Sequence, residues 1–404
     1  MAISILSKFS NFKLRKQLLL LLLVSTILPI ALLGAYGDWA LGKLAAGAVE
    51  NVEEETSNEA NSVLVFLENT QEDTRFLSDL HALEEFLAAR RGETPSGLNA
   101  DEWKDQAIDD ITALLENKPE YQQIRYIDED GQEIIRVRRD NDNRDQIESV
   151  PASALADTGD LPYVQAALEL EPEEIHVSEI ALQRNLGQPL PDQGGITHYS
   201  VPVLDQSGNR SGIVVVDLFF DRIVSLLQAD EDEGQTDYDA EESVFIINAE
   251  GDYLENPVDR SKEWGSDLGH ENNFQADYSE ESAQTILSNN QGVVETGGDF
   301  AAYVKIDPNP DQDGEHFYIV EVQPRRAIYG AINTFRSVEI LIAVLALATA
   351  LPIGILRGQQ LMGLVERLTN SISTSSQQVF STVSEQERIA SQQSASVSET
   401  STTM

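Results

Sequence analysis

The sequence predicts an α+β protein in which two antiparallel-sheet modules lie on a long N-terminal helix, flanked by two transmembrane helices and followed by a helical coiled-coil segment. Three observations predict this arrangement. Two apolar runs, at 18–36 and 338–356, bracket a polar middle region. Within that region the spacing of apolar residues changes from three and four to two near Tyr121. After the second run, apolar and small residues recur every seven positions.

The two apolar runs, LLLLLLVSTILPIALLGAY (18–36) and VEILIAVLALATALPIGIL (338–356), each have the length of a membrane span. At roughly 1.5 Å per helical residue, such a run approaches the thickness of the bilayer hydrocarbon. The first run exceeds the apolar part of a signal peptide, so we expect a retained anchor, with a cleaved signal as the alternative. The basic residues in 1–16 then place both termini in the cytoplasm and the middle region outside the inner (plasma) membrane.

The charge of the chain lies almost entirely in the middle region. The whole sequence has 27 Lys and Arg against 69 Asp and Glu. Setting aside four basic residues in 1–16, and three basic and five acidic residues in 338–404, leaves 20 basic and 64 acidic residues, a net charge near −44. Such a surface repels nucleic acid and anionic membranes, so neither is an expected partner. Without Cys, the chain has no disulfide framework, thiolate metal site or Cys nucleophile.

The middle region begins with helices and continues with strand pairs. Residues 38–90 carry an apolar stripe that predicts one long helix, and a second helix is expected after an Asp101 cap. From Tyr121 onward, YQQIRYIDEDGQEIIRVRR predicts a hairpin with an Asp-Gly turn. A helix at 162–170 and a strand pair at 197–220 complete this unit.

The same order of elements then recurs, which indicates an internal repeat. VFIINAEGDYLENP (244–257) matches the first hairpin, and AAYVKIDPNPDQDGEHFYIVEVQP (301–324) matches the second strand pair, with Tyr303 in the place of Tyr199. Each unit therefore supplies at least four antiparallel strands. A sheet of this size needs a helix over one face, and its other face can hold a pocket.

This order resembles the double Cache sensor, in which two PAS-like modules follow a long helix between two membrane spans. The stretches that carry the resemblance are IDEDGQEIIRVRR, IHVSEIALQRNLGQPLP, SVPVLDQSGNRSGIVVVDL, and FIINAEGDYLENP with KEWGSDLG. The resemblance covers nearly all of 38–336. It implies a basic lead (1–16), a first span (17–36), a long extracytoplasmic helix (37–84), a membrane-distal ligand-binding module (85–230), a membrane-proximal module (240–330), a second span (338–356) and a cytoplasmic signalling helix (357–404).

The C-terminal segment SEQERIASQQSASVSETSTTM resembles the start of the adaptation helix of bacterial methyl-accepting chemotaxis proteins. In that family, Gln and Glu pairs at heptad spacing are deamidated and methyl-esterified, which tunes the like-charge repulsion between packed helices. The sequence lacks the usual two-helix relay after the span and ends before a hairpin tip, so we expect either a truncated signalling region or a span that leads directly into the signalling helix. The resemblance implies methylation at Glu385, Gln386, Gln392, Gln393 and Glu399.

The resemblance places the ligand in the membrane-distal module. A small charged or zwitterionic solute needs a cation for its carboxylate, an anion for its amine, and aromatic rings that exclude water. In amino-acid-binding members of the family, a Tyr and an Asp occupy about the positions of Tyr199 and Asp217. Their Arg-x-Trp-Tyr signature is absent here, and its nearest equivalents are Arg184 and His198. The expected ligand-binding residues are Arg136, Tyr163, Arg184, Tyr199 and Asp217.

The sequence offers little support for metal or enzyme chemistry. Residues 309–315 have the alternating acids and turn Gly of a calcium loop, but Val320 stands where the last acidic ligand belongs, so a solvated turn is expected. The five His share no metal-ligand spacing. Nucleotide-binding, hydrolase, metalloprotease and kinase motifs are all missing, so we expect no enzyme activity, no cofactor and no metal.

These features predict a homodimeric transmembrane chemoreceptor that binds a small solute outside the cell and signals to a cytoplasmic kinase and coupling protein. The sensor half of a histidine kinase or cyclic-dinucleotide enzyme is the first alternative, because Cache sensors are shared among outputs. A membrane-tethered solute-binding protein without output is the second. The repeated Gln and Glu pairs favour the chemoreceptor, since the alternatives do not need them.

The charge of the middle region predicts that its stability depends on salt. The screening length falls from about 10 Å at 0.1 M salt to about 3 Å at 1 M, so added salt relieves self-repulsion. We expect the melting temperature of the full chain to rise between 0.1 and 1 M NaCl, and a fall over this range would contradict the prediction.

Overall fold

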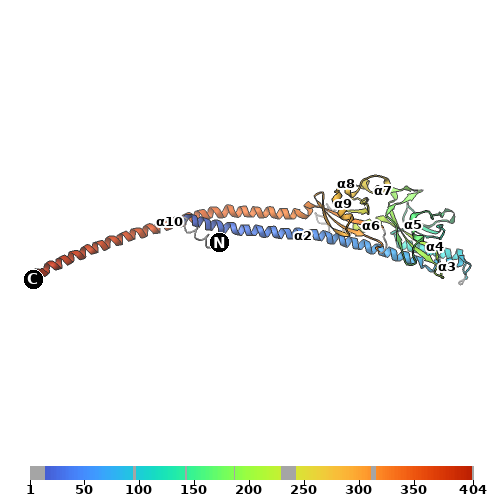
Figure 1. The fold of residues 1–404 in the computed structure, drawn as a ribbon, viewed down its shortest axis with the longest axis horizontal. Helices are drawn as coiled ribbons and strands as arrows, with labels where there is room; N and C mark the ends of the chain where they lie inside the picture. The colour runs from blue at the N-terminus through green and yellow to red at the C-terminus, as the bar shows by residue number, and fades with distance from the viewer. Residues whose placement is uncertain are drawn as a thin grey trace. The chain divides into compact units, whose positions relative to one another are not determined.

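The computed structural model describes residues 14–93, 97–141, 143–185, 187–228, 243–310 and 315–402. They form two compact units. Residues 45–330 make up one, which we call the sensor unit, and the ends of the chain, up to Leu44 and from Ala331, make up the other. Both sheets belong to the sensor unit, and the other unit is helical (Figure 1).

Two long helices, α2 (Leu14–Ser78) and α10 (Arg325–Thr402), include residues of both units. Each contains one internal proline, Pro29 in α2 and Pro352 in α10. Among the described residues, one helix, Ile332–Val397, is long and apolar enough to cross a membrane. It includes the second predicted span, and the backbone of the first predicted span is helical within α2.

The first module of the sensor unit is an antiparallel sheet with the strand order β3-β2-β1-β9-β8-β4, and β5 also pairs with β8. A separate two-stranded hairpin, β6 with β7, lies beside it in the chain. The module comprises α3 (His81–Arg90), α4 (Ala100–Asn117), β1 (Tyr121–Ile127), β2 (Glu133–Arg139), β3 (Ile147–Ser149), α5 (Pro162–Leu168), β4 (His176–Val177), β5 (Ala181–Leu182), β6 (Arg184–Asn185), β7 (Gln188–Pro189), β8 (Gly195–Leu204), β9 (Arg210–Phe219) and α6 (Phe220–Gln228).

The second module has an antiparallel sheet with the order β11-β10-β14-β13-β12. Three short α-helices lie between β11 and β12. The module comprises β10 (Ser243–Asn248), β11 (Tyr253–Glu255), α7 (Gly265–Leu268), α8 (Phe274–Asp277), α9 (Glu280–Leu287), β12 (Gln291–Thr296), β13 (Asp299–Ile306) and β14 (Phe317–Pro324).

The predicted internal repeat is confirmed by the strand order and by the turns. The order β2-β1-β9-β8-β4 in the first module corresponds to β11-β10-β14-β13-β12 in the second. Asp128 directly follows β1 and Asn248 is the last residue of β10, and each side-chain Oδ1 accepts hydrogen bonds from the backbone N–H groups two and four residues further on. Both turns need Gly at positive φ, 81° at Gly131 and 88° at Gly251.

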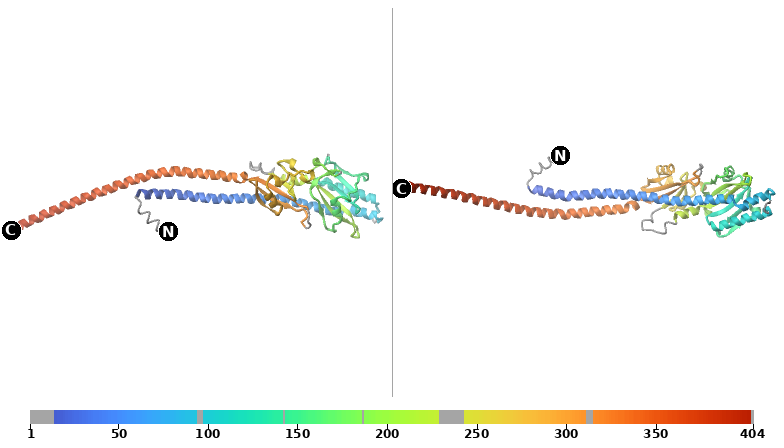
Figure 2. Two further views of the ribbon diagram at one scale, coloured as in Figure 1. Left: turned by 45° about the horizontal axis from the view of Figure 1, so that its top comes forward. Right: turned by 90° about the horizontal axis from the view of Figure 1, so that it is seen from below.

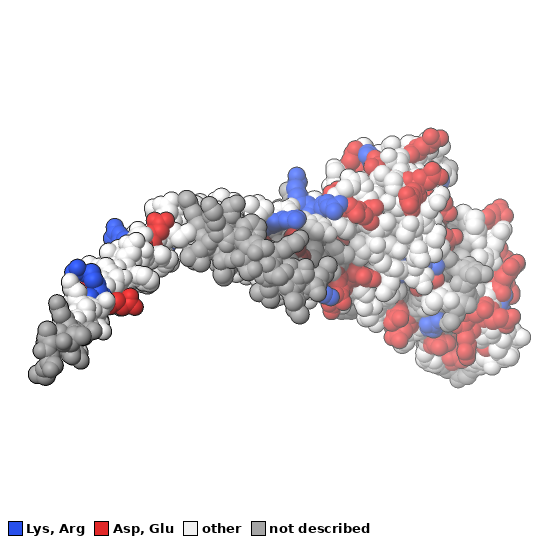
Figure 3. Space-filling model, turned by 60° about the vertical axis from the view of Figure 1, so that its left-hand side comes forward, with Lys and Arg blue, Asp and Glu red and all other residues white. Residues whose placement is uncertain are grey.

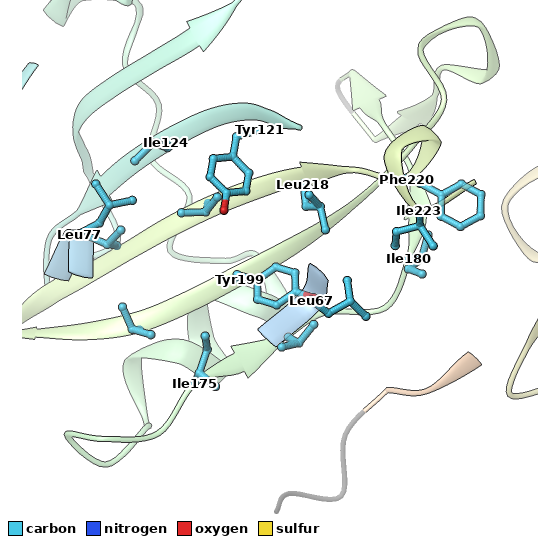
Figure 4. Packing of buried hydrophobic residues seen from close by; sticks show 14 of the residues in the cluster. Leu67, Leu77, Tyr121, Ile124, Ile175, Ile180, Tyr199, Leu218, Phe220 and Ile223 are labelled. Atoms are coloured by element: carbon cyan, nitrogen blue, oxygen red, sulfur yellow. The ribbon is translucent and has the colours of Figure 1, made fainter. Parts of the chain in front are cut away.

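One face of each sheet packs against α2, which runs along both modules (Figure 2). Near its start in the sensor unit, Val52 packs with Ala302 of β13. Further along, Leu67 and Leu77 lie in the core with Leu218 of β9 (Figure 4). The buried residues of this stripe recur at spacings of three and four, as one face of a helix requires: Val52, Thr56, Ala60, Val63, Leu67, Thr70, Thr74 and Leu77.

Trp264 extends the second module into the core of the first. Its backbone is left-handed, with φ 62° and ψ 39°, a costly conformation for a residue with a Cβ. The indole ring covers Gly195 at the start of β8 and meets Phe220 edge-on, with 5.4 Å between ring centroids. The core of the first module is therefore shared with residues of the second: Ile246, Leu254, Trp264, Val304, Ile306, Phe317 and Ile319.

Two predicted helix boundaries are wrong. The long helix ends at Ser78 instead of residue 90, because Leu80 is extended and α3 starts a new direction that buries its own apolar face. The cap of α4 is Asn99 instead of Asp101. Asn99 Oδ1 accepts from the N–H groups of Asp101 and Glu102, and Glu102 accepts from the Asn99 N–H in return.

The contact of Trp264 with Gly195 predicts a specific steric cost. Gly195→Ala would place a methyl group inside the indole ring, and Gly195 is not at positive φ, so the cost is one of packing. We expect the substitution to lower the free energy of unfolding by about 2 kcal/mol in chemical denaturation of the full chain. Trp264→Phe should recover part of this loss in a double-mutant cycle, whereas strictly additive effects would contradict the contact.

Candidate ligand-binding site

The two faces of β1 lie in different environments. Ile124 and Tyr126 belong to the apolar core, whereas Gln123 and Arg125 point toward the side of the sheet covered by α5. Strand pairing sets Gln123 opposite Asp217, and Asp217 opposite His198. On this face the polar side chains form one connected group, which we call the charged cluster: Gln123, Arg125, Glu133, Arg136, Tyr163, His198 and Asp217.

Asp217 is the centre of the charged cluster and is fully buried. Its Oδ1 accepts hydrogen bonds from Arg125 Nη2 at 2.7 Å and from His198 Nδ1 at 2.8 Å, and its Oδ2 accepts one from Gln123. Burial by itself would raise the pKa of Asp217, but the charges and hydrogen bonds of Arg125 and His198 outweigh it and hold the pKa well below its usual range. Asp217 is therefore an ionised carboxylate whose oxygens already have partners.

Arg125 links the sheet to α5. Its side chain is 4% exposed, and its Nη1 donates a hydrogen bond to the Tyr163 hydroxyl at 2.6 Å. Burial would lower the pKa of Arg125, but neighbouring Asp217 more than compensates, and the pKa lies above its ordinary value. The Tyr163 ring stacks on His198 with 4.1 Å between centroids. Through Tyr163, the short helix α5 covers the centre of the cluster with an aromatic ring.

Arg136 is the charged residue of the cluster nearest to solvent, with 25% of its side chain exposed. Its Nε donates to Gln123 Oε1 at 2.7 Å, and its Nη1 lies 3.6 Å from Glu133 Oε2. Glu133 is itself buried and accepts a hydrogen bond from the Ala156 N–H at 3.1 Å. The cluster thus balances two guanidinium groups against two carboxylates, and Arg136 is the cation that a solute would reach first.

A second group of polar side chains continues along β1 from the charged cluster. Gln122 Nε2 donates to Gln183 Oε1 at 2.5 Å and to Asn141 Oδ1 at 3.3 Å. Gln183 and Asn141 in turn donate to the backbone and the side chain of Gln193, at 2.9 and 3.0 Å. Because amides both donate and accept, this group can bond a solute of either polarity.

Two buried polar atoms on this face have no hydrogen-bond partner among the described residues, Arg125 Nε and Ser200 Oγ. They lie in the same row across the sheet, because Arg125 and Ser200 both pair with Val215. A buried polar group without a partner costs about 1–3 kcal/mol. Such a cost is typical of a site that a ligand or water completes.

The charged cluster is chemically suited to bind a small solute. A buried ion pair contributes less stability than a well-packed apolar pair, so its presence indicates a role other than stability. An ammonium group would have to compete with Arg125, His198 and Gln123 for Asp217, which is fully buried and already accepts a hydrogen bond from each of them. A carboxylate, in contrast, can approach the guanidinium of Arg136 from the solvent side. The arrangement therefore favours a solute with an anionic group.

The structure brings together three of the five predicted ligand-binding residues, Arg136, Tyr163 and Asp217. The prediction missed Arg125, Gln123 and Glu133, which complete the cluster. The available signal was alternation. In YQQIRYI, the polar residues Gln123 and Arg125 are two positions apart and alternate with Ile124 and Tyr126, and alternate positions of a strand share one face.

The other two predicted residues lie elsewhere. Tyr199 follows His198 in β8, so it points to the opposite face, where it is buried in the core near Leu67 (Figure 4). Arg184 lies on the β6–β7 hairpin and forms an ion pair with Asp267 of α7 in the second module. Neither side chain contacts the charged cluster among the interactions of the described residues.

The predicted methylation residues lie on α10, outside the sensor unit, and the calcium-like segment, where a solvated turn is predicted, is only partly described. Four of the predicted methylation residues have exposed side chains on α10, namely Glu385, Gln386, Gln392 and Gln393, and the side chain of Glu399 lies outside the description. Most of the calcium-like segment, 311–314, lies outside the described residues. Among the residues that are described, no group of three or more His, Asp or Glu is placed to hold a metal ion.

The surface of the sensor unit is strongly acidic. Figure 3 shows several patches of Asp and Glu side chains among the uncharged residues of its visible face, with fewer Lys or Arg. A solute with an anionic group must therefore cross an unfavourable field to reach Arg136, and salt screens that field.

The fold of the sensor unit is shared with known sensor domains. It is similar to a domain of a putative sensory box/GGDEF family protein from Vibrio parahaemolyticus, with 17% identity, a TM-score of 0.56, and coverage of 70% of this chain and 99% of that one. The extracellular domain of a putative histidine kinase gives 16% identity, a TM-score of 0.56, and coverage of 72% and 96%. The periplasmic sensory domain of a Campylobacter jejuni chemoreceptor has 13% identity and a TM-score of 0.48, with coverage of 71% of this chain and 98% of that one.

The first two similarities, both with TM-scores of 0.56, identify an α+β, Cache-like sensor fold. Among curated protein sequences, none matches this chain. The family model described as the sensor domain of bacterial histidine kinases matches residues 54–320, which include the first sheet with the charged cluster and all of the second sheet except the end of β14. The chain therefore belongs to the bacterial histidine kinase sensor domain family.

Proposed function

We propose that the protein is a membrane receptor that binds a small solute at the charged cluster and passes the signal to a cytoplasmic partner through α10. The observation that carries this proposal is the fully buried pair of Asp217 and Arg125, covered by Tyr163 and continued to the solvent side by Arg136. The solute is small and bears a carboxylate or another anionic group. We propose no catalytic activity for these residues.

The proposed receptor crosses the inner membrane twice and acts as a homodimer. Ile332–Val397 supplies one apolar helix, and the run at 18–36, preceded by basic residues, supplies the other. With two spans, both termini are cytoplasmic and the sensor unit is periplasmic or extracellular. The extracellular and periplasmic origin of the similar sensor domains supports the same location.

Two outputs are candidates. Heptad-spaced Gln and Glu residues on α10 support a chemoreceptor that signals to a kinase and coupling protein and is adjusted by methylation. The family match supports a histidine kinase sensor instead. We favour the chemoreceptor, because the heptad-spaced Gln and Glu residues lie on α10, the helix that would carry the output. The region matched by the family model ends at residue 320, before α10 begins.

Ligand binding can be tested on the full chain in lipid nanodiscs. We expect at least one member of a panel of small carboxylates and amino acids to raise the melting temperature. Arg136→Gln should raise the solute concentration that gives half of this effect about tenfold or more, because the solute loses a charge-assisted hydrogen bond. The melting temperature without solute should change little, since Arg136 is partly exposed.

Two further variants make the ligand test specific. Glu148→Gln removes an exposed partner of Arg138, with both side chains 40% exposed, and should leave solute binding unchanged. Asp217→Asn should destabilise the protein by about 3–5 kcal/mol, because it leaves Arg125 buried without its counter-charge. A solute that binds equally well to wild type and to Arg136→Gln would place the site elsewhere.

The output can be tested in cells. If the protein is a chemoreceptor, mass spectrometry of peptides covering 377–399 should find glutamyl methyl esters at Glu385 or Glu399, or deamidated Gln386, Gln392 or Gln393.

The topology can be tested by cysteine labelling. Because the chain has no Cys, the variants Ser401→Cys and Ser261→Cys each carry a single thiol that can be labelled from either side of the membrane. Labelling of both from the same side, or unmodified peptides in cells with active methylation, would argue against this output.

A further inference from the structure

The short helix α7 of the second module contacts one edge of the first sheet through Asp267. This side chain is 9% exposed, and its Oδ2 accepts a hydrogen bond from the Leu182 N–H of β5 at 2.9 Å. Its Oδ1 accepts a hydrogen bond from Arg184 Nη2 on the β6–β7 hairpin. Hydrogen bonds to an ionised carboxylate are stronger than those to a neutral oxygen. Asp267 therefore fixes both β5 and the start of the hairpin that follows it.

Trp264, which directly precedes α7, contacts the strand partner of Leu182. Leu182 pairs with Gly195 of β8, and the Trp264 indole covers Gly195. The Trp264 N–H donates a hydrogen bond to the Tyr253 carbonyl of β11 at 2.7 Å. Trp264 and Asp267 thus hold the two members of one strand pair in the first module and connect that pair to the second sheet.

The backbone of Trp264 indicates that this connection has a role beyond packing. In the described part of the chain, Trp264 is the one residue other than Gly at positive φ. This conformation is costly for a residue with a Cβ, and it persists where the surrounding contacts require it. Residues strained in this way concentrate at ligand clamps and switch regions. The strain therefore marks the junction of α7 with the first sheet as a candidate functional element.

The residue after Leu182 extends this contact to the candidate site. Gln183 Oε1 accepts a hydrogen bond from Gln122 Nε2 of β1 at 2.5 Å, and Gln183 Nε2 donates to the Gln193 carbonyl at 2.9 Å. Gln122 precedes Gln123 of the charged cluster, at a register shift in the pairing of β1 with β9. Such β-bulges are common beside binding sites, because they redirect side chains. The segment held by α7 therefore supplies part of the polar surface beside the charged cluster.

We propose that Asp267 is a positioning residue for the solute site and that α7 passes the state of this site to the second module. Asp267 holds Leu182, which keeps Gln183 in place for a solute bound at the charged cluster. A solute that bonds Gln183 displaces this segment, and the displacement reaches Trp264 through Asp267. The second sheet, to which Trp264 is bonded, includes β14, which continues directly into α10. This inference rests on the function proposed above.

The positioning role can be tested without a solute, by hydrogen exchange of the full chain in lipid nanodiscs. Asp267→Ala should speed exchange of the Leu182 amide about tenfold or more, because its acceptor is lost, and exchange at Gln183 should rise with it. Asp267→Asn keeps an oxygen that can accept from Leu182 and should stay closer to wild type. The matched control is Asn309→Ala, which removes a different hydrogen bond between the modules, to the Ile175 carbonyl, and should leave this exchange unchanged.

Transmission to the second module can be measured by the fluorescence of Trp264. In a background of Trp39→Phe and Trp103→Phe, Trp264 is the single Trp of the chain. The probes are acetate, succinate and L-glutamate, which belong to the solute class proposed above. We expect a saturating probe that raises the melting temperature also to change the Trp264 emission. Because coupling is reciprocal, Asp267→Ala should abolish the emission change and weaken probe binding about fivefold, whereas Asn309→Ala should do neither.

The results distinguish this inference from the function on which it rests. If a probe raises the melting temperature of wild type but not of Arg136→Gln, and Trp264 emission stays constant, the solute site stands and transmission through α7 is overturned. Unchanged exchange of the Leu182 amide in Asp267→Ala overturns the positioning role. If no probe raises the melting temperature, the proposed function is contradicted and transmission falls with it, while hydrogen exchange still decides whether Asp267 positions Gln183.

Discussion

The apolar stripe of α2 is the contact on which the rest of the sensor unit depends. From Val52 to Leu77 its buried residues recur at the spacing of one helix face, and both sheets bury a face against it. Neither sheet could be stable alone, because each has one face that a helix must cover. Hydrogen bonds add to this contact, as where Thr56 donates to Glu321 of β14 at 2.6 Å. Since α2 serves as backing for both sheets, the opposite faces remain available for function.

The two modules use these free faces differently. In the second module, aromatic rings fill the face, with Phe274 stacked on Tyr278 at 4.5 Å and Phe245 edge-on to Phe274. In the first module, the corresponding face holds two guanidinium groups and two carboxylates. The same strand order thus supports an apolar core in one copy and a charged cluster in the other. The copy that accepts the energetic cost of buried charge is the one with the candidate site.

Much of the fold could be predicted from the sequence, because local chemistry determines it. The Asp-Gly turn, the alternation in β1 and β2, and the repeat of both in the second module are all local signals. The side chains of the site were harder to predict, since they meet through strand register. Arg136 and Asp217 are joined by Arg125 and Gln123, which only the pairing of β1 with β2 and β9 brings between them. Tyr199 is predicted from the sequence to be a ligand-binding residue, but the neighbouring His198 occupies the face of β8 that points toward the charged cluster, so Tyr199 lies on the opposite face.

The sharing of one core between the modules affects how the polypeptide is made. Trp264 and other residues of the second module fill space inside the first, so the core of the first module stays incomplete until the ribosome has added residues up to Ile319. During synthesis, nearly a hundred residues emerge after α6 ends before this apolar surface is sealed. A chaperone or the export machinery must shield it meanwhile. A chain interrupted at residue 228 would keep that surface open, and aggregation would be its expected fate.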